Sequence, residues 1–279
     1  MSVLDPLADW PVDHFGAVVM APGGTWQAGE TDRVFELASV TKLLAAYAVL
    51  IAVEEGAIEL DQPAGPQGST VRHLLAHASG LGFAHGDPVR PVGQRRVYSS
   101  AGFEALATQV EQATGMGFAQ YLHEAVTEPL GMGNTQLYGS AGHGARSTGA
   151  DMAAFVGELR EPRLLDSSTL AEAWSVQWPQ LRGVVPGYGM HKPCPWGLGF
   201  EIRGNKDPHW TGPAMPAETV GHFGMSGTYL WLDPGSGAAM VALTDREFGP
   251  WAREAWAPLN QQVWEAVSGG GASTSEANP

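Results

Sequence analysis

The sequence predicts an α+β fold: an antiparallel β-sheet built from both ends of the chain, flanked by helices, with an inserted, mostly helical lobe. Three observations lead to this. Apolar runs typical of strands lie near the N-terminus (residues 16–21) and near the C-terminus (227–232 and 238–244). Helical patterns fill the middle of the chain. The 279 residues are 44% hydrophobic, which is enough for a sizeable buried core.

This pattern divides the chain into lobes. Residues 1–60 and 190–267 are expected to form the sheet lobe, and residues 61–189 the mostly helical lobe. Residues 268–279 are rich in glycine, serine and other small polar residues, so we expect a disordered tail there.

The N-terminal part of the sequence predicts a strand, followed by a buried helix. Residues 16–21 predict a strand that ends in the turn residues 22–24, Pro-Gly-Gly. Residues 34–37 lead into residues 43–53, an uncharged run bounded by Glu54 and Glu55. That run is too short to span a bilayer and has no polar face, so it predicts a helix buried on all sides that stops at Gly56.

Four further helices are expected in the middle of the chain, each with a capping residue at its start or a glycine or proline at its end. They cover residues 69–77, 100–114, 118–127 and 149–159. The last third predicts a strand over 196–202, a hairpin whose strands flank the turn 233–237, and a closing amphipathic helix over 251–267.

Composition narrows the function. The net charge of −14 argues against nucleic acid or an anionic membrane as a partner, because both require basic patches. Cys194 is the single cysteine, so no internal disulfide is possible. The first ten residues lack the features of a signal peptide, which makes a cytoplasmic protein the expectation. The expected partner is a small-molecule substrate, with the oligomeric state left open.

Ser39 and Lys42 carry the strongest chemical signal. They lie three residues apart at the start of the apolar helix, so they share one helical face. A lysine with little access to water favours its neutral form, and a neutral amine beside a hydroxyl is a base beside a nucleophile. Two plainer readings stay open: the spacing can arise by chance, and Lys42 can extend to the surface from the first turn.

The chain resembles the serine β-lactamase and penicillin-binding-protein superfamily, closest to the branch of class C β-lactamases, D,D-peptidases and family VIII esterases. The matching segments occur in family order: 35–42 with the Ser-x-x-Lys motif, 71–81 ending in Ser-Gly-Leu, 128–132 with Pro-Leu-Gly-Met, and 196–200, Trp-Gly-Leu-Gly-Phe. This resemblance implies an α/β sandwich, β-lactamase/transpeptidase-like, with an all-helical lobe.

The resemblance also implies roles. Tyr98 stands where the family has Tyr-x-Asn, so it would act as general base with Lys42, whose ammonium would lower the pKa of the phenol. The alternative is a packed tyrosine followed by a capping serine. Residues 222–224, His-Phe-Gly, stand where the family has Lys-Thr-Gly or His-x-Gly, which makes His222 a catalytic candidate. Its alternative is a satisfied histidine near a turn.

The same motif implies an oxyanion hole made by the backbone N–H groups of Ser39 and Met225, on an edge strand beside the nucleophile. Gly224 and Gly221 would let that strand approach a substrate closely.

The chain departs from the family at two motifs. Ser100 replaces an asparagine that binds substrate, and His222 and Phe223 replace a lysine and a threonine. Ser100, Phe223 and Gly224 are therefore the expected substrate-binding positions, without the permanent cation that would pair with a substrate carboxylate. Arg95, Arg96 or another arginine is a possible replacement.

Other sites are weaker. His73 and His77 have the i, i+4 spacing of metal ligands, but no glutamate follows His73 and no third ligand is evident, so a structural role is preferred. No metal or cofactor is expected. The Gly-x-Ser-x-Gly motif of α/β-hydrolases is absent from the sequence.

These observations predict a serine hydrolase that acts through an acyl-enzyme on a small ester, amide or β-lactam. The two departures favour an esterase over a β-lactamase or a D-amino-acid peptidase proper. A third hypothesis is a catalytically weak penicillin-binding or sensor module.

Overall fold

The computed structural model describes residues 2–268, and its central element is a six-stranded antiparallel sheet with the order β2-β1-β11-β10-β9-β8. Strands β1 and β2 come from the N-terminal part of the chain and the other four from the C-terminal part. Their bounds are β1 Phe15–Ala21, β2 Gly24–Gly29, β8 Glu201–Ile202, β9 Val220–Gly224, β10 Thr228–Asp233 and β11 Ala238–Thr244. Phe15 pairs with Thr244, so the sheet joins the two ends of the chain, as predicted.

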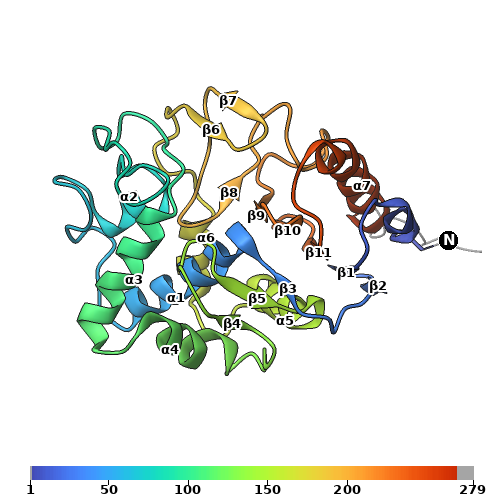
Figure 1. The fold of residues 1–279 in the computed structure, drawn as a ribbon, viewed down its shortest axis with the longest axis horizontal. Helices are drawn as coiled ribbons and strands as arrows, with labels where there is room; N and C mark the ends of the chain where they lie inside the picture. The colour runs from blue at the N-terminus through green and yellow to red at the C-terminus, as the bar shows by residue number, and fades with distance from the viewer. Residues whose placement is uncertain (1, 269–279) are drawn as a thin grey trace, which may run out of the picture.

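The two faces of this sheet are both buried, because successive strand residues point to opposite sides. In β10, Tyr229 and Trp231 belong to one core, with residues of the C-terminal helix α7 (Pro250–Ser268). Leu230 and Leu232 belong to the other core, with residues of the buried helix α1 (Thr41–Glu54). The sheet therefore lies between two helical layers, which confirms the predicted sandwich (Figure 1).

Shorter elements complete the chain. The helical ones are η1 Asp5–Asp9, η2 Ala38–Val40, α2 Val71–Leu75, α3 Ala101–Thr114, α4 Phe118–Leu122, η3 His123–Thr127, α5 Gly149–Arg160 and α6 Ser167–Ala173. A small sheet contains β3 Phe35–Glu36, β4 Gln136–Leu137 and β5 Ala145–Ser147, and a hairpin contains β6 Gly183–Val185 and β7 Gly189–His191. Figure 1 shows α1, α3 and α4 on one side of the molecule and α7 beside the N-terminus on the other.

Helix α1 is buried as the sequence predicts. Every residue from Thr41 to Ala52 is buried, and the helix ends where Gly56 takes a left-handed conformation (φ +72°). Helix α3 likewise ends at Gly115, with φ +71°. Charged residues are missing from most of α1 because the helix contacts neighbours all round.

Three expectations about local structure are wrong. Helix α2 stops at Leu75, and His77 has φ +55°, so His73 and His77 do not share a helix. The predicted strand over 196–202 is reduced to Glu201–Ile202, since Gly199 has φ +88° and a Cβ there would lie 2.1 Å from the Ala46 side chain. Ser268, assigned to the tail, ends α7, and residues 269–279 lie outside the described residues.

Strand β9, which carries the His222 motif, is not the edge strand that the sequence suggested. It lies between β10 and β8, and β8 forms the edge. The division of the chain into lobes stays a prediction, and α5, inside the 61–189 segment, contacts β1 and β11 of the sheet. Within residues 2–268, no helix is both long and apolar enough to cross a membrane.

Candidate active site

Ser39 lies in the short helix η2 at the point where the chain turns from β3 into α1. The residue before it, Ala38, has φ +44°, a left-handed conformation that a side chain rarely adopts. Such strain persists only where the surroundings enforce it, and it concentrates at functional sites. Ser39 is 8% exposed, so its hydroxyl lies in a nearly enclosed position.

Lys42 is wholly buried in the first turn of α1, with 0% exposure. Its Nζ lies 3.3 Å from Ser39 Oγ and 3.1 Å from Ser100 Oγ, and it donates a 2.7 Å hydrogen bond to the Gly142 carbonyl. Burial lowers the pKa of Lys42 to about 7, although the charge of Glu104 opposes this. At neutral pH a large share of Lys42 is therefore an uncharged amine beside the serine, and the surface-exposed alternative does not describe this side chain.

Tyr98 lies over the same lysine. Lys42 Nζ is 4.7 Å from the centroid of its ring. Burial raises the pKa of Tyr98 above its usual range, and the hydrogen bond with Ser39 lowers it only in part. The expected lowering is wrong, because burial and the negative charge of Glu201 both disfavour a phenolate at this position. Tyr98 is thus a neutral phenol that can pass a proton on.

His222 is the next polar group. It is 2% exposed on β9, and its Nδ1 lies 2.7 Å from the Phe223 carbonyl while its Nε2 lies 3.4 Å from Tyr98 Oη. A carbonyl only accepts, so Nδ1–H donates to it and Nε2 is free to accept the Tyr98 hydroxyl. Burial, together with the charge of Lys42, lowers the pKa of His222 to about 4, so this ring is neutral near pH 7.

The end of β9 is held tightly against the segment that carries Ser39. A Cβ on Gly224 would lie 2.3 Å from the Leu37 carbonyl oxygen, which leaves no room for a side chain. Thr228 Oγ1 donates a 2.9 Å bond to the same carbonyl, and Ser226 Oγ donates a 2.6 Å bond to that of Glu36. These contacts fix residues 225–226 beside Ser39.

Two backbone donors stay available at this junction. Among residues 2–268, neither the N–H of Ser39 nor that of Met225 makes a hydrogen bond to another group. Unpaired backbone donors near a nucleophile are the groups that an oxyanion requires. The expected pairing of Ser39 with Met225 therefore has the donors it needs.

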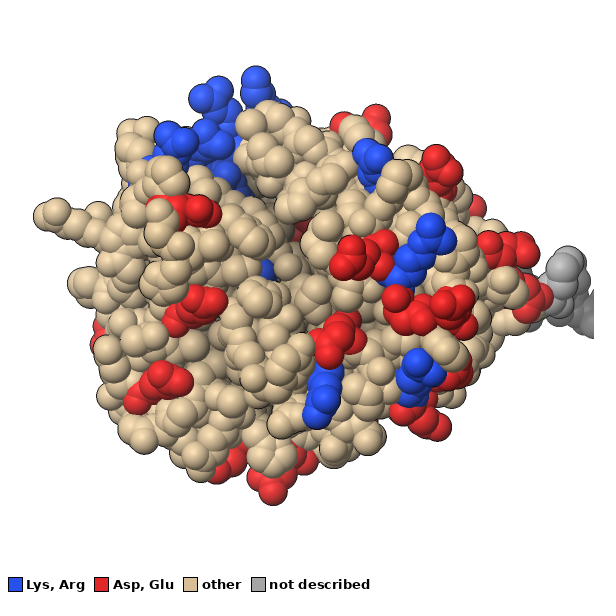
Figure 2. Space-filling model, in the orientation of Figure 1, with Lys and Arg blue, Asp and Glu red and all other residues tan. Residues whose placement is uncertain are grey.

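Ser39 opens on a cavity of about 250 Å³. Its walls are mainly aromatic and apolar: Phe83, Tyr98, Val185, Pro186, Trp196, Glu201, His222, Phe223 and Met225 line it together with Ser39. Figure 2 shows a hollow near the middle of this face, in which small blue and red areas are visible, while the largest group of Lys and Arg side chains lies at the upper left. A cavity that is largely apolar with a few polar groups is typical of a small-molecule site.

Among the residues that line the cavity, the charged one is Glu201, which was not selected in the sequence analysis. Its carboxylate lies 3.0 Å from Lys206 Nζ and 3.1 Å from His209 Nε2, and it accepts a 2.8 Å bond from Trp210 Nε1. Burial alone would raise the pKa of Glu201, but the charge of Lys206 and these bonds hold it well below its usual range. The sequence signal that could have pointed to Glu201 is that this acid directly follows the apolar run 196–200.

No arginine takes the place of the missing cation. Arg96 is 2% exposed, and its guanidinium donates to the carbonyls of Ala76, Gln177 and Cys194. Neither Arg95 nor Arg96 lines the cavity that holds Ser39. The suggestion that Arg96 replaces it is wrong, because backbone carbonyls already occupy its donors.

The expected substrate-binding residues lie in different places. Ser100 is 4% exposed, and its hydroxyl contacts Lys42. The serine that caps α3 is Ser99, whose Oγ accepts the Gly102 N–H at 2.9 Å. Phe223 lines the cavity, and its ring also lies 5.1 Å from Phe248 in the core beneath α7.

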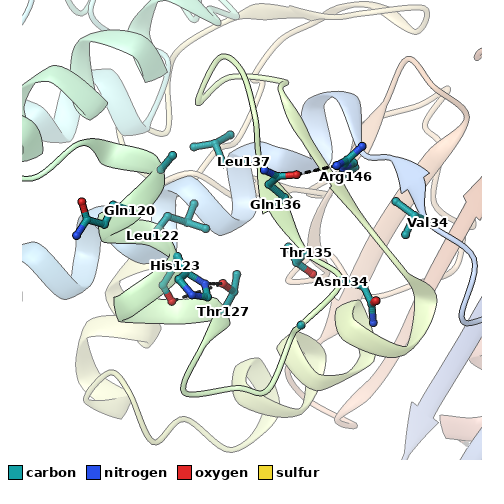
Figure 3. Close-up of a pocket in the computed structure, with 12 residues that line it drawn as sticks. Val34, Gln120, Leu122, His123, Thr127, Asn134, Thr135, Gln136, Leu137 and Arg146 are labelled. Carbon is teal, nitrogen blue, oxygen red and sulfur yellow. Dashed lines mark hydrogen bonds between the residues drawn. The ribbon is translucent and has the colours of Figure 1, made fainter.

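A larger cavity lies elsewhere. It measures about 740 Å³ and lies between α4, η3 and the β4–β5 hairpin, with no member of the Ser39 group in its walls (Figure 3). Its polar groups bond to one another: His123 Nδ1 lies 2.9 Å from Thr127 Oγ1, and Arg146 donates to Gln136 at 2.8 Å. Across residues 2–268 no group of His, Cys, Asp and Glu side chains could hold a metal ion.

Known proteins share this architecture. The structure is similar to the crystal structure of a beta-lactamase, Mb2281c, from Mycobacterium bovis, with 50% identity, a TM-score of 0.93, and coverage of 96% of this chain and 100% of that one. Among curated proteins, a penicillin-binding protein of Bacillus subtilis is 31% identical over 142 residues, which cover 39% of this chain and 32% of that protein.

Esterase EstB of Burkholderia gladioli is 31% identical over 147 residues, which cover 36% of this chain and 38% of the esterase. The matched segments thus span about a third of the length of these curated relatives. The family model for Beta-lactamase matches residues 12–263, nearly the whole of the chain. With the sandwich fold and the Ser39–Lys42 pair in the expected place, the chain belongs to the Beta-lactamase family.

Proposed function

We propose that this protein is a serine hydrolase that cleaves small, uncharged esters through an acyl-enzyme. The observation that carries the proposal is the meeting of Ser39 Oγ with the buried Nζ of Lys42 at 3.3 Å, on the wall of an apolar cavity. An amine whose pKa is lowered to about 7 is a base matched to neutral pH.

In the first step, Ser39 attacks the ester carbonyl while its proton moves to the neutral Nζ of Lys42. The negative charge that develops on the carbonyl oxygen is stabilised by the N–H groups of Ser39 and Met225. When the intermediate collapses, the carbon–oxygen bond to the alcohol breaks. The alcohol leaves with the proton that Lys42 had taken.

Tyr98 and His222 assist this proton movement. The Tyr98 hydroxyl donates towards His222 Nε2, which turns a lone pair of its oxygen towards the serine. The one proton of Ser39 still goes to Lys42, and Tyr98 and His222 keep their own protons while their hydrogen bonds hold the serine hydroxyl in place. In the second half of the reaction, water attacks the acyl group and gives a proton to the neutral Nζ of Lys42. The bond between the acyl carbon and Ser39 Oγ then breaks, the acid is released, and Lys42 returns the proton to Ser39.

The charges in the cavity wall favour a substrate without a negative charge. The cavity has no lysine or arginine in its walls, and its one carboxylate, Glu201, is ionised. A substrate carboxylate would leave water for a site without a cation, which is costly. A volume of about 250 Å³ suits a short or compact acyl group, since a cavity of about 150 Å³ binds benzene.

β-Lactam hydrolysis is the second candidate, and the 50% identity to a beta-lactamase crystal structure favours it. The deciding experiment compares p-nitrophenyl butyrate with nitrocefin on the purified protein, with Ser39→Ala as the inactive variant. The exposed Ser175→Ala is the matched control.

We expect turnover of the butyrate ester that Ser39→Ala abolishes and Ser175→Ala leaves unchanged. Turnover of nitrocefin with negligible ester cleavage would establish the second candidate. A stable fluorophosphonate adduct on Ser39 without turnover of either compound would favour a sensor module, and equal activity in Ser39→Ala would refute the mechanism.

A further inference from the structure

His77 adopts a backbone conformation that is unusual for its side chain. It follows α2, is 1% exposed, and has φ +55°. Chains that leave a helix in this left-handed conformation usually place glycine there, because any other side chain carries a steric cost. A buried histidine kept in such a position points to a use for the imidazole.

The contacts of His77 bracket Tyr98. Its carbonyl accepts the N–H of Val97 at 2.8 Å, and its Nδ1 accepts the N–H of Ser99 at 3.2 Å. Val97 and Ser99 are the two chain neighbours of Tyr98. One residue therefore holds the backbone on both sides of the tyrosine.

The ring of His77 also supports the ring of Tyr98 from behind. Their centroids lie 4.8 Å apart, and the other neighbours of the imidazole are Trp196 at 4.9 Å and Phe103 at 5.5 Å. Close packing of rigid rings leaves few orientations open to Tyr98. His77 does not line the cavity at Ser39, so its contact is with Tyr98 and not with a substrate.

These bonds require one form of the imidazole. Because Nδ1 accepts from Ser99, the single proton resides on Nε2, which has no hydrogen-bond partner among residues 2–268. A second proton on Nδ1 would end the bond to Ser99. Burial lowers the pKa of His77 well below its usual value, and the charge of Arg96 lowers it further. The ring is thus a neutral, fixed support.

We propose that His77 is a positioning residue that holds the Tyr98 hydroxyl between Ser39 and His222 through the Ser99 N–H···Nδ1 bond and the ring contact. The inference rests on the proposed hydrolase, in which Tyr98 holds the hydroxyl of Ser39 in place for proton transfer to Lys42. It gives the segment 71–81, which ends in Ser-Gly-Leu, a role in proton transfer that does not depend on contact with the substrate.

The test compares two substitutions. His77→Asn keeps an acceptor at the place of Nδ1 and tolerates the left-handed backbone, whereas His77→Leu keeps volume without an acceptor. With p-nitrophenyl butyrate we expect His77→Leu to lower kcat about a hundredfold with KM changed less than about threefold, and His77→Asn to stay within about threefold of wild type. Thermal unfolding of each variant shows that it is folded.

A double-mutant cycle separates positioning from general damage. In the Tyr98→Phe background, His77→Leu should lower kcat by less than about threefold further, because the hydroxyl that it positions is already gone. An equal loss in both backgrounds, or an equal loss for the folded Asn and Leu variants, would overturn the proposal.

A crystal structure of His77→Leu gives an answer that does not depend on activity. We expect Tyr98 Oη to move away from Ser39 and His222, and an unmoved Tyr98 would overturn the proposal. Failure of the proposed function is recognised separately, since the wild-type protein would then not cleave the ester at all.

Discussion

The pH dependence of ester cleavage tests the role of Lys42 most directly. The proposed base is the uncharged amine, and burial lowers the pKa of Lys42 to about 7. Because kcat/KM reports the ionisation of the free enzyme, it should follow the fraction of Lys42 that has lost its proton. Activity is therefore expected to rise with pH and to reach half its maximum near pH 7.

The size of this rise follows from the titration. With a pKa of about 7, about one eleventh of Lys42 is neutral at pH 6 and about ten elevenths at pH 8, so kcat/KM should increase about tenfold between them. Other bases predict other curves. His222, with a pKa of about 4, would give no change over this range, and ionisation of Tyr98 would place the rise far above pH 8.

Glu104→Gln provides the matched perturbation. The charge of Glu104 raises the pKa of Lys42, so its removal should move the midpoint to lower pH. Glutamine keeps an acceptor for the 2.7 Å bond from Ser140 Oγ, which limits the change to charge. The assay is kcat/KM for p-nitrophenyl butyrate between pH 5 and pH 9 at constant ionic strength, corrected for spontaneous hydrolysis. A flat profile from pH 6 to pH 8, or a midpoint that rises in Glu104→Gln, would refute the reasoning.

Three further predictions concern neighbouring residues. Tyr98→Phe should lower kcat/KM by about 10²- to 10⁴-fold with an unchanged thermal midpoint, and a loss of less than fivefold would remove Tyr98 from the mechanism. Gly224→Ala should reduce the free energy of unfolding, measured in urea, by about 1–3 kcal/mol and should abolish ester cleavage, because the new Cβ would lie 2.3 Å from the Leu37 carbonyl oxygen. Wild-type stability together with wild-type activity would contradict this. Glu201→Gln should destabilise the protein by about 3 kcal/mol in the same urea assay, since Lys206 would stay buried without the charged partner that lies 3.0 Å away. Equal stability of the wild type and the variant at pH 7 would show that the Glu201–Lys206 pair is dispensable.

Elements with a strong local signal were predictable. Helix α1 could be read because its run is uncharged, and the β10–β11 hairpin because Asp233 and Gly237 supply its turn, in which Gly237 N–H bonds to Asp233 O at 2.9 Å. The closeness of Ser39 and Lys42 followed from their spacing, since a helix brings residues three apart onto one face, whereas their expected roles came from the family resemblance. These features depend on neighbours in the sequence.

Features decided by distant contacts were not predictable in this way. Strand β2 has mostly exposed residues, so it lacks the apolar alternation that reveals a strand. Residues 196–200 have the composition of a strand but turn at Gly199 because Ala46 of α1 occupies the space of a side chain. The pKa of Tyr98 depends on burial, on the hydrogen bond with Ser39 and on the charge of Glu201, and all three are properties of the folded site.

The pairing of β1 with β11 has a consequence for synthesis on the ribosome. His14 and Asp245, which are joined by a hydrogen bond beside this pair, lie 231 positions apart. In a nascent chain, β1 therefore cannot pair with β11 until nearly all of the protein has left the ribosome. Until then an apolar strand edge is open to pairing with other chains. Translation products that stop before β11 would carry Ser39 and Lys42 but would lack the strand that closes the sheet around them. Such truncated products are expected to depend on chaperones or to aggregate.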